Sequence, residues 1–143
     1  MTIPHEIRLG DWALLHADAT AIRFEVFVDE QKVPAEIELD QMDAQCLHAV
    51  AYDGAGTPVG TGRLLPDGHI GRMAVRKAAR GGGVGAVLLR TLIEVARQRG
   101  ERAVVLSAQL QAAPFYARHG FVIEGGQFME AGIAHVQMRC LLT

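Results

Sequence analysis

Apolar residues early in the chain recur at the spacing of an amphipathic helix. In the segment 19–31, Ile22, Val26 and Phe27 lie at positions i, i+4 and i+5, which places them on one helical face. The preceding segment, residues 6–12, has the length of a short strand. We therefore expect a strand and then a helix at the start of the chain.

Three strand-like apolar runs follow this helix. The first two are joined by Asp-Gly-Ala-Gly and the third follows an Asp-Gly pair, which are strong turn signals, so we expect antiparallel neighbours. The runs span residues 46–53, 57–65 and 67–75. Before them, residues 32–45 combine Pro34 with a group of acids, and we expect a loop there with room for a helical turn.

The second half of the chain alternates between helix and strand. A long helix follows the glycine-rich segment 79–86 and ends at Gly100. Its apolar face is formed by Val84, Val87, Leu88, Leu92, Val95 and Ala96. Residues 102–108 form an apolar strand that we expect to be buried on both faces. A short helix over 111–120 and a hairpin over 121–142 complete the predicted elements.

The chain has the size and composition of one globular domain. Its 143 residues suffice for one sizeable core, and 50% are hydrophobic and 21% charged. With the order of elements, this predicts an α+β fold in one domain, residues 1–143, with a single mixed, mostly antiparallel central sheet flanked by helices. The formal net charge of −2 disfavours a nucleic-acid partner, which needs clustered basic residues.

Cysteine and histidine spacing argues against disulfides and metal sites. Cys46 and Cys140 are far apart without a Cys-x-x-Cys motif, and the six histidines show no ligand spacing. No apolar run approaches the roughly 18 residues that span a membrane, and the first residues lack an apolar signal core. We therefore expect a cytoplasmic protein with no metal and no membrane partner. His48 and His135, each in a strand-like run, are expected to be structural.

The segment 79–86, "ARGGGVGA", opens the long helix with four glycines. A glycine inside a helix costs up to about 1 kcal/mol relative to alanine. At a helix N-terminus, however, bare backbone lets several N–H groups converge on an anion, and Arg80 adds a positive charge. No Lys-Ser or Lys-Thr follows, which excludes a Walker P-loop, and the next strand lacks the acid of a dinucleotide fingerprint. A phosphate-binding turn and a plain connector remain open.

Together with its neighbours, this turn resembles one known family. "RGGGVG" is similar to the Arg-x-x-Gly-x-Gly motif that binds the acyl-CoA pyrophosphate in the GCN5-related N-acetyltransferase (GNAT) superfamily. "GRMAV" before it, and "RAVVLSAQ" and "AAPFYARHGF" after it, match further family segments in the family's order over residues 58–122. Outer segments such as "GIAHVQM" resemble the small bacterial ElaA/YjcF-like branch.

The resemblance implies a splayed pair of strands with a CoA cleft between them. It implies that backbone groups of Met73 and Val75 pair with the pantetheine amides, and that the N–H of Ala74 or Val75 polarises the thioester carbonyl. Gln109 stands where many members carry Asn beside the CoA arm. The implied co-substrate is acetyl-CoA. The residues implied at its pyrophosphate are Arg80, Gly81, Gly82, Gly83, Val84 and Gly85.

The implied reaction is acyl transfer to an amine. The amine, with a pKa of about 10.4, must lose a proton, and a thiolate, from a thiol of about 8.5, must leave. Tyr116 occupies the family's general-acid position, as a hydrogen-bond donor or a proton donor. His69 lies near the position where some relatives carry a carboxylate base on the same strand. Glu38, Asp40 and Asp43 lie in the loop that faces the expected acceptor entrance, where an acidic rim would attract a cationic amine. A core tyrosine, a solvated histidine and a solvated acidic loop are the alternatives.

These residues predict an acetyl-CoA-dependent N-acetyltransferase that transfers the acetyl group directly to a primary amine of a small molecule or peptide. Cys140 has no evident base partner, so we expect no covalent enzyme intermediate. Two alternatives remain: a CoA-binding sensor without catalysis, and an acyltransferase that uses a longer acyl-CoA. Dimers are common in the family, so a homodimer is a further expectation.

Overall fold

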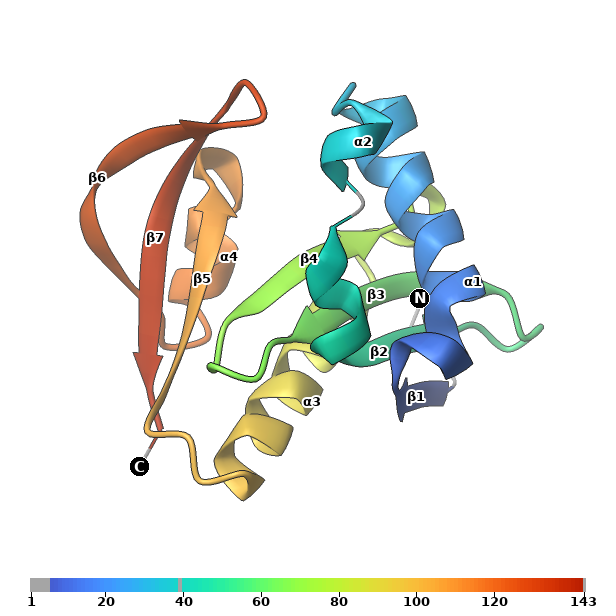
Figure 1. Ribbon diagram of the computed structural model, residues 1–143, viewed down its shortest axis with the longest axis horizontal. Coiled ribbons are helices and arrows are strands. Elements are labelled where there is room, and N and C mark those ends of the chain that lie inside the picture. Colours follow the sequence, from blue (N-terminus) through green and yellow to red (C-terminus); the bar gives the residue numbers. More distant parts are fainter. Residues whose placement is uncertain (1–5, 39, 143) are drawn as a thin grey trace.

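The strands form two antiparallel sheets in the computed structural model, which describes residues 6–38 and 40–142 (Figure 1). The first sheet has the order β1-β2-β3-β4, with bounds Glu6–Gly10, Leu47–Tyr52, Pro58–Leu64 and Ile70–Val75. The second has the order β5-β7-β6, and β5, β6 and β7 span Ala103–Gln109, Val122–Glu130 and Ile133–Leu141. The predicted α+β class and the predicted order of strands are confirmed.

Helices precede, connect and flank these sheets. The α-helices are α1 (Trp12–Arg23), α2 (Ala35–Glu38), α3 (Val84–Gln98) and α4 (Ala113–Ala117). A π-helical segment, η1 (Phe24–Glu30), continues α1, and the 3₁₀ turns are η2 (Gln41–Gln45), η3 (Lys77–Ala79) and η4 (Leu110–Ala112). The segment expected as a loop thus contains two short helical elements, α2 and η2. Within the described ranges, no helix is long and apolar enough to cross a membrane.

Strand β2 lies between two packed clusters. Ala49 and Ala51 belong to the cluster that contains Leu88 of α3, whereas Val50 and Tyr52 belong to the cluster built on α1. Successive residues of a strand point to opposite faces of the sheet. Helices α1 and α3 therefore cover opposite faces of the four-stranded sheet, and α3 brings its N-terminus close to the end of β4 (Figure 1).

The two sheets meet where β4 approaches β5. His69 and Val105 form one parallel bridge, where the N–H of Val105 donates to the carbonyl of Gly68 at 3.2 Å. Beyond it, β4 pairs with β3 and β5 pairs with β7, and no further β4–β5 pairing occurs among the described residues. The prediction of one continuous sheet is therefore wrong, because the sheet divides between β4 and β5. The splayed pair of strands at this division was predicted.

Two expectations about burial are also corrected. Strand β5 is not buried on both faces: Val104, Leu106 and Ala108 are buried, whereas Ser107 between them is exposed. The face of β5 opposite the core is therefore available to line a site. On α3, the buried stripe is broader than predicted and displaced. It contains Val84, Leu88, Leu89, Leu92, Ile93 and Ala96, while Val87 and Val95 are only half-buried.

Candidate active site

Two cavities lie along the splayed strands and share part of their walls. One, of about 510 Å³, lies at the start of α3 and is called the glycine-turn cavity here. The other, of about 440 Å³, lies between β4, β5, the β6–β7 turn and the η1–α2 region, and is called the polar cavity. Met73, Ala112 and Tyr116 line both cavities. A chemical group bound beside these three residues can therefore be reached from both cavities.

A β-bulge in β4 shapes the wall between the cavities. Thr61 pairs with Ala74 and Arg63 with Gly71, so Arg72 and Met73 together stand opposite Gly62. Bulges bend a strand and redirect its side chains, and consistent with this Arg72 has a positive φ of 48°. As a result two successive residues, Arg72 and Met73, both line the polar cavity.

Beyond the bulge, β4 turns the backbone of Val75 away from β3. The N–H of Arg76 donates to the carbonyl of Val59 at 2.9 Å, which makes this pair a hydrogen-bonded one. Antiparallel ladders alternate hydrogen-bonded and open pairs. The backbone N–H and C=O of Ala74 therefore point toward β3, whereas those of Val75, which forms an open pair with Gly60, point away from it. Consistent with this, the carbonyl of Val75 accepts from Arg80 Nε at 2.9 Å. Of the two predicted N–H donors, Val75 faces away from β3.

The glycine turn is open where a ligand would approach it. Gly81 and Gly83 have positive φ angles of 85° and 88°, which glycine adopts without a Cβ penalty. A Cβ on either residue would meet nothing within 4 Å, so space is left in front of the turn. Gly83 is the N-cap of α3 and offers no side-chain cap, so the first N–H groups of the helix lack a capping side chain.

Arg80 lines the glycine-turn cavity but is held by protein groups. Its two terminal nitrogens donate to the Glu30 carboxylate at 2.7 Å each, a bidentate ion pair with both side chains more than a third exposed. This hydrogen bonding lowers the pKa of Glu30. Glu30 would have to release Arg80 before the guanidinium could pair with a phosphate.

Tyr116 lies at the junction of the two cavities. Its ring is buried and packs edge-on against Phe115 and Phe121, with ring centroids 5.1 and 5.9 Å away. Burial raises the pKa of Tyr116 to about 12. The phenol is therefore neutral at physiological pH and acts as a hydrogen-bond donor more readily than as an acid, since a thiol of about 8.5 is the stronger acid.

Gln109 and His69 lie at different places relative to the cavities. Gln109 lines the polar cavity, not the glycine-turn cavity, and its amide donates to Gln31 Oε1 and accepts from Gln111 Nε2, both at 2.7 Å. His69 lines neither cavity. Its ring is about half exposed, and Nδ1 lies 3.0 Å from Asp67 Oδ1 in the turn before β4. The structure therefore does not bring His69 together with Tyr116.

The acidic segment does not form a solvated loop. Glu38 and Asp43 are each only 2% exposed, and the buried Arg23 binds both of them. Its Nε donates to Glu38 Oε1 at 2.6 Å, and its terminal nitrogens donate to Asp43 at 2.9 and 3.1 Å. Arg63 joins Asp43 to Asp40 through bonds of 2.8 to 2.9 Å. Arg72 adds ion pairs of 3.2 Å to Asp40 and 3.6 Å to Glu38. The three acids and three arginines form one ionic cluster, which is buried except at Asp40 and Arg72.

The ionic cluster leaves one carboxylate oxygen exceptional. Both oxygens of Asp40 and both of Asp43 accept arginine N–H groups, and hydrogen bonding from Arg63 lowers the pKa of Asp40 to about 2. Glu38 Oε2 is buried and has no hydrogen-bond partner among the described residues. Because Glu38 and Asp40 line the polar cavity, the cluster forms one of its walls.

His135, expected to be structural, lines the polar cavity from β7. It is 7% exposed, pairs across the ladder with Gln109 and stacks on Phe128. Nδ1 lies 2.7 Å from the carbonyl of Ile133, which can only accept, so Nδ1 carries the proton of this bond. In the neutral ring Nε2 then has the lone pair, and it lies 3.6 Å from Glu130 Oε2. In the sequence, a single histidine in a strand-like run gives no indication that it lines a cavity.

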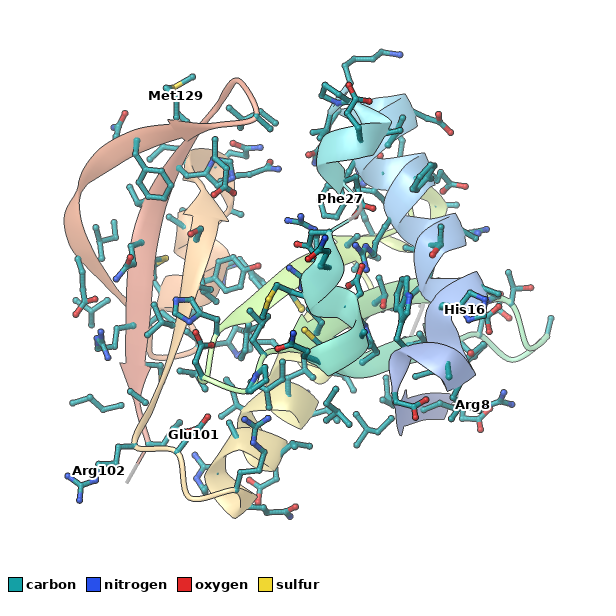
Figure 2. The ribbon with its side chains drawn as sticks, viewed as in Figure 1. Arg8, His16, Phe27, Glu101, Arg102 and Met129 are labelled. Atoms are coloured by element: carbon teal, nitrogen blue, oxygen red, sulfur yellow. The ribbon has the colours of Figure 1, made fainter. Side chains whose placement is uncertain are left out.

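Phe27 completes the polar cavity on the helical side. Figure 2 shows it on the inner face of the η1 segment, toward the three-stranded sheet, with Met129 near the β6–β7 turn across from it. No group of three or more His, Cys, Asp or Glu residues arranged to hold a metal ion occurs within residues 6–38 and 40–142.

Comparison with known proteins gives a consistent result. Residues 15–142 match the family described as the acetyltransferase (GNAT) domain. The chain is 44% identical over 125 residues to YjcF of Bacillus subtilis, an uncharacterized N-acetyltransferase, covering 85% of this chain and 89% of YjcF. It is similar to the crystal structure of an acyl-CoA N-acyltransferase from Pseudomonas aeruginosa (32% identity, TM-score 0.83, 94% and 98% of the two chains). Escherichia coli ElaA is also similar (26% identity, TM-score 0.83, the same coverage).

Proposed function

The chain belongs to the GNAT acetyltransferase family and is an acyl-CoA-dependent N-acyltransferase, and we propose that it moves an acetyl group from acetyl-CoA directly to a primary amine. The observation that carries this proposal is the meeting of two cavities at Met73 and Tyr116. A donor in one cavity and an acceptor in the other would meet at these residues, which is the proximity that a direct transfer requires.

The glycine-turn cavity suits the CoA moiety. Gly81, Gly83 and Gly85 line it, the turn is open, and the N-terminus of α3 favours an anion. We propose that the backbone from Arg80 to Gly85 holds the pyrophosphate and that the edge of β4 at Met73 and Val75 binds the pantetheine arm. Bound there, acetyl-CoA supplies the thioester carbonyl that the amine attacks.

The residues at the junction would stabilise the charges that develop during transfer. The N–H of Val75 faces away from β3 and is suited to donate to the carbonyl oxygen as it becomes negative. Tyr116, kept neutral by its raised pKa of about 12, is suited to donate a hydrogen bond to the sulfur as the C–S bond breaks. In the transfer, one N–C bond forms, one C–S bond breaks so that CoA leaves as the thiolate, and the amine gives up one proton.

We propose that His135 accepts this proton. Its Nδ1–H is fixed by Ile133, so Nε2 is the basic atom, and Glu130 at 3.6 Å would stabilise the ring once it is protonated. Glu38, a predicted site residue that lies on the cavity wall, pairs with Arg23; neutralising Glu38 in each cycle would leave a buried guanidinium less compensated. His69 lines neither cavity, which weakens its case.

The experiment that tests the function is release of CoA thiol from acetyl-CoA on addition of a panel of primary amines. We expect amine-dependent release together with N-acetylated product by mass spectrometry. If the protein binds CoA and no amine triggers release, it is a CoA-binding sensor and the proposal is wrong. Faster release from a long-chain acyl-CoA than from acetyl-CoA would instead identify a different acyl donor. The homodimer stays a prediction, which sedimentation velocity would test.

A further inference from the structure

The polar cavity is acidic in a way that the reacting amine alone does not explain. Its lining residues include the carboxylates of Glu38, Asp40 and Glu130 and the guanidinium of Arg72. Arg23 and Arg63 pair with the acids from behind this wall and are shared with Asp43, so four carboxylates and three guanidiniums leave a formal charge of −1, with His135 counted as neutral. The reacting nitrogen has to be neutral when it attacks, because a protonated amine has no lone pair. An acceptor with only one amine would therefore bring no positive charge to this wall during the reaction.

The second observation is the orphaned oxygen on that wall. The Glu38 side chain is 1% exposed, and Arg23 occupies Oε1 at 2.6 Å, but Oε2 is buried without a partner among the described residues. A buried carboxylate oxygen without a donor is costly, since it loses its hydration and gains no hydrogen bond. The neighbouring acids do not share this state, because arginines occupy all four oxygens of Asp40 and Asp43.

The positions of these groups separate two ends of the cavity. Glu38 ends α2, whereas Tyr116 and Met73 lie where the cavity joins the glycine-turn cavity. Glu130 and His135 come from the β6–β7 hairpin, whose turn faces α2 from the side of the three-stranded sheet (Figure 1). An acceptor with its reacting nitrogen at the Tyr116 junction would extend its other end toward α2.

From this arrangement we infer that the acceptor is a small diamine-like compound, with one amine that reacts and a second, cationic N–H group that donates to Glu38 Oε2. This inference rests on the proposed function and names the substrate class of the same site. The ionic cluster has a defined part in it: Arg23, itself held by Asp43, donates to Oε1 of Glu38 and fixes this carboxylate in place. Glu38 is then a binding residue for the second amine, and His135 serves the reacting one.

The test compares 1,4-diaminobutane with n-butylamine, which has the same chain length and one amine fewer. We expect wild-type kcat/KM for the diamine to exceed that for the monoamine by about tenfold or more, the value of one charge-assisted hydrogen bond. Equal values for the two amines would overturn the inference while leaving the N-acetyltransferase function intact. Failure of both amines, with every other amine in the panel, would overturn the function as well.

The variant Glu38→Gln tests the residue itself. It keeps the shape of the side chain and leaves Arg23 paired with Asp43. We expect the diamine-to-monoamine ratio to fall to about one, through loss of diamine activity. Because the ratio does not depend on the fraction of folded enzyme, a purely structural role for Glu38 would lower both activities and leave the ratio unchanged, which would overturn the assignment.

Glu36→Gln is the matched control, because Glu36 lies on the same short helix but is exposed and lines neither cavity. It should keep the wild-type ratio. A Glu36→Gln ratio that falls as far as that of Glu38→Gln would mean that general surface charge, and not Glu38 Oε2, attracts the diamine. If Glu38→Gln does not fold at all, the wild-type comparison of the two amines still decides the substrate class.

Discussion

The two cavities that meet at Tyr116 are built in different ways. The glycine-turn cavity takes most of its wall from one continuous stretch, residues 73–86, and from the α4 region, and backbone atoms do much of its work. The polar cavity takes side chains from η1, α2, β4, β5 and the β6–β7 hairpin, and its chemistry lies in charged and polar groups. The glycine-turn cavity is thus formed mainly by one local motif, whereas the polar cavity is formed by side chains from distant parts of the chain.

This difference has consequences for what each cavity can recognise. Backbone N–H groups at a helix N-terminus bind phosphate whatever the neighbouring side chains are. The proposed recognition of an acceptor by Glu38, Glu130 and His135 would depend on each of those side chains, so we expect single substitutions to change it. We therefore expect changes in the glycine turn to affect cofactor affinity, and changes in the polar cavity to affect turnover and acceptor choice.

The largest expected effect is a loss of CoA affinity in the glycine-turn cavity. Gly83→Glu places a carboxylate where a pyrophosphate would bind, and like-charge repulsion at short range should weaken CoA binding by about 100-fold or more. Calorimetric titration with CoA measures this. The open space in front of Gly83 lets the fold persist, although a non-glycine residue at φ 88° costs about 1–2 kcal/mol.

Gly56→Glu is the matched control for that strain. Gly56 has a φ of 81° and equally open surroundings, but it lies in the β2–β3 turn and lines neither cavity. It should lose similar stability and keep CoA affinity. Equal CoA affinity in Gly83→Glu and Gly56→Glu would mean that the glycine turn is only a connector.

The next largest effect is expected in the polar cavity, at His135. His135→Gln removes the proposed base, and kcat/KM should fall about 100-fold with CoA affinity unchanged. The pH–rate profile should also lose its acidic limb, a result that a structural histidine would not produce. His16→Gln, on the exposed face of α1 (Figure 2), should retain wild-type kinetics. A larger loss in His69→Gln than in His135→Gln would contradict the assignment.

Tyr116→Phe tests the residue that both cavities share. Loss of one hydrogen bond to the leaving sulfur should lower kcat about tenfold while CoA affinity stays near wild type. Because the pKa of Tyr116 is raised to about 12, this phenol should cause no loss of activity between about pH 7 and 10. Tyr52→Phe, in a tyrosine bonded to Asp18 outside both cavities, serves as the control. Equal turnover in the two variants would exclude Tyr116 from the chemistry.

The contrast between the cavities also explains how far the sequence could lead. Helix α3 and its glycine turn follow from local spacing, so the sequence alone predicts correctly that Gly83 precedes the helix and that Val84 lies on its buried face. Arg23 and His135 lie more than 100 positions apart, and neither stands in a motif that names its function. The place of His135 in the cavity wall and the bond of Arg23 to Glu38 in that wall depend on sheet register and on how α1 packs, which are long-range properties. The bulge at Arg72, for the same reason, had no signature.

A smaller effect concerns the acid dependence of the ionic cluster. The pKa of Asp40 in the folded chain is about 2, below its unfolded value near 3.8, so its ion pair with Arg63 stabilises the fold above that unfolded value. The contribution is lost as pH falls from about 4 toward 2. Urea unfolding should show wild type more stable than Asp40→Asn at about pH 6, with the gap narrowing at about pH 3. A gap that is constant with pH would mean that the ion pair contributes nothing.

The smallest expected effect is on Cys140, and it separates direct transfer from a covalent route. Cys140 lies on β7, where it pairs with Val104 of β5, and it lines neither cavity. Its Sγ is 3.9 Å from the carbonyl oxygen of His119. Burial raises the pKa of this thiol, which makes it a poorer nucleophile. Cys140→Ala should keep more than about half of wild-type kcat in the thiol-release assay. Abolished turnover in a variant that still folds and binds CoA would show that the acyl group passes through the enzyme, and two meeting cavities would then no longer account for the transfer.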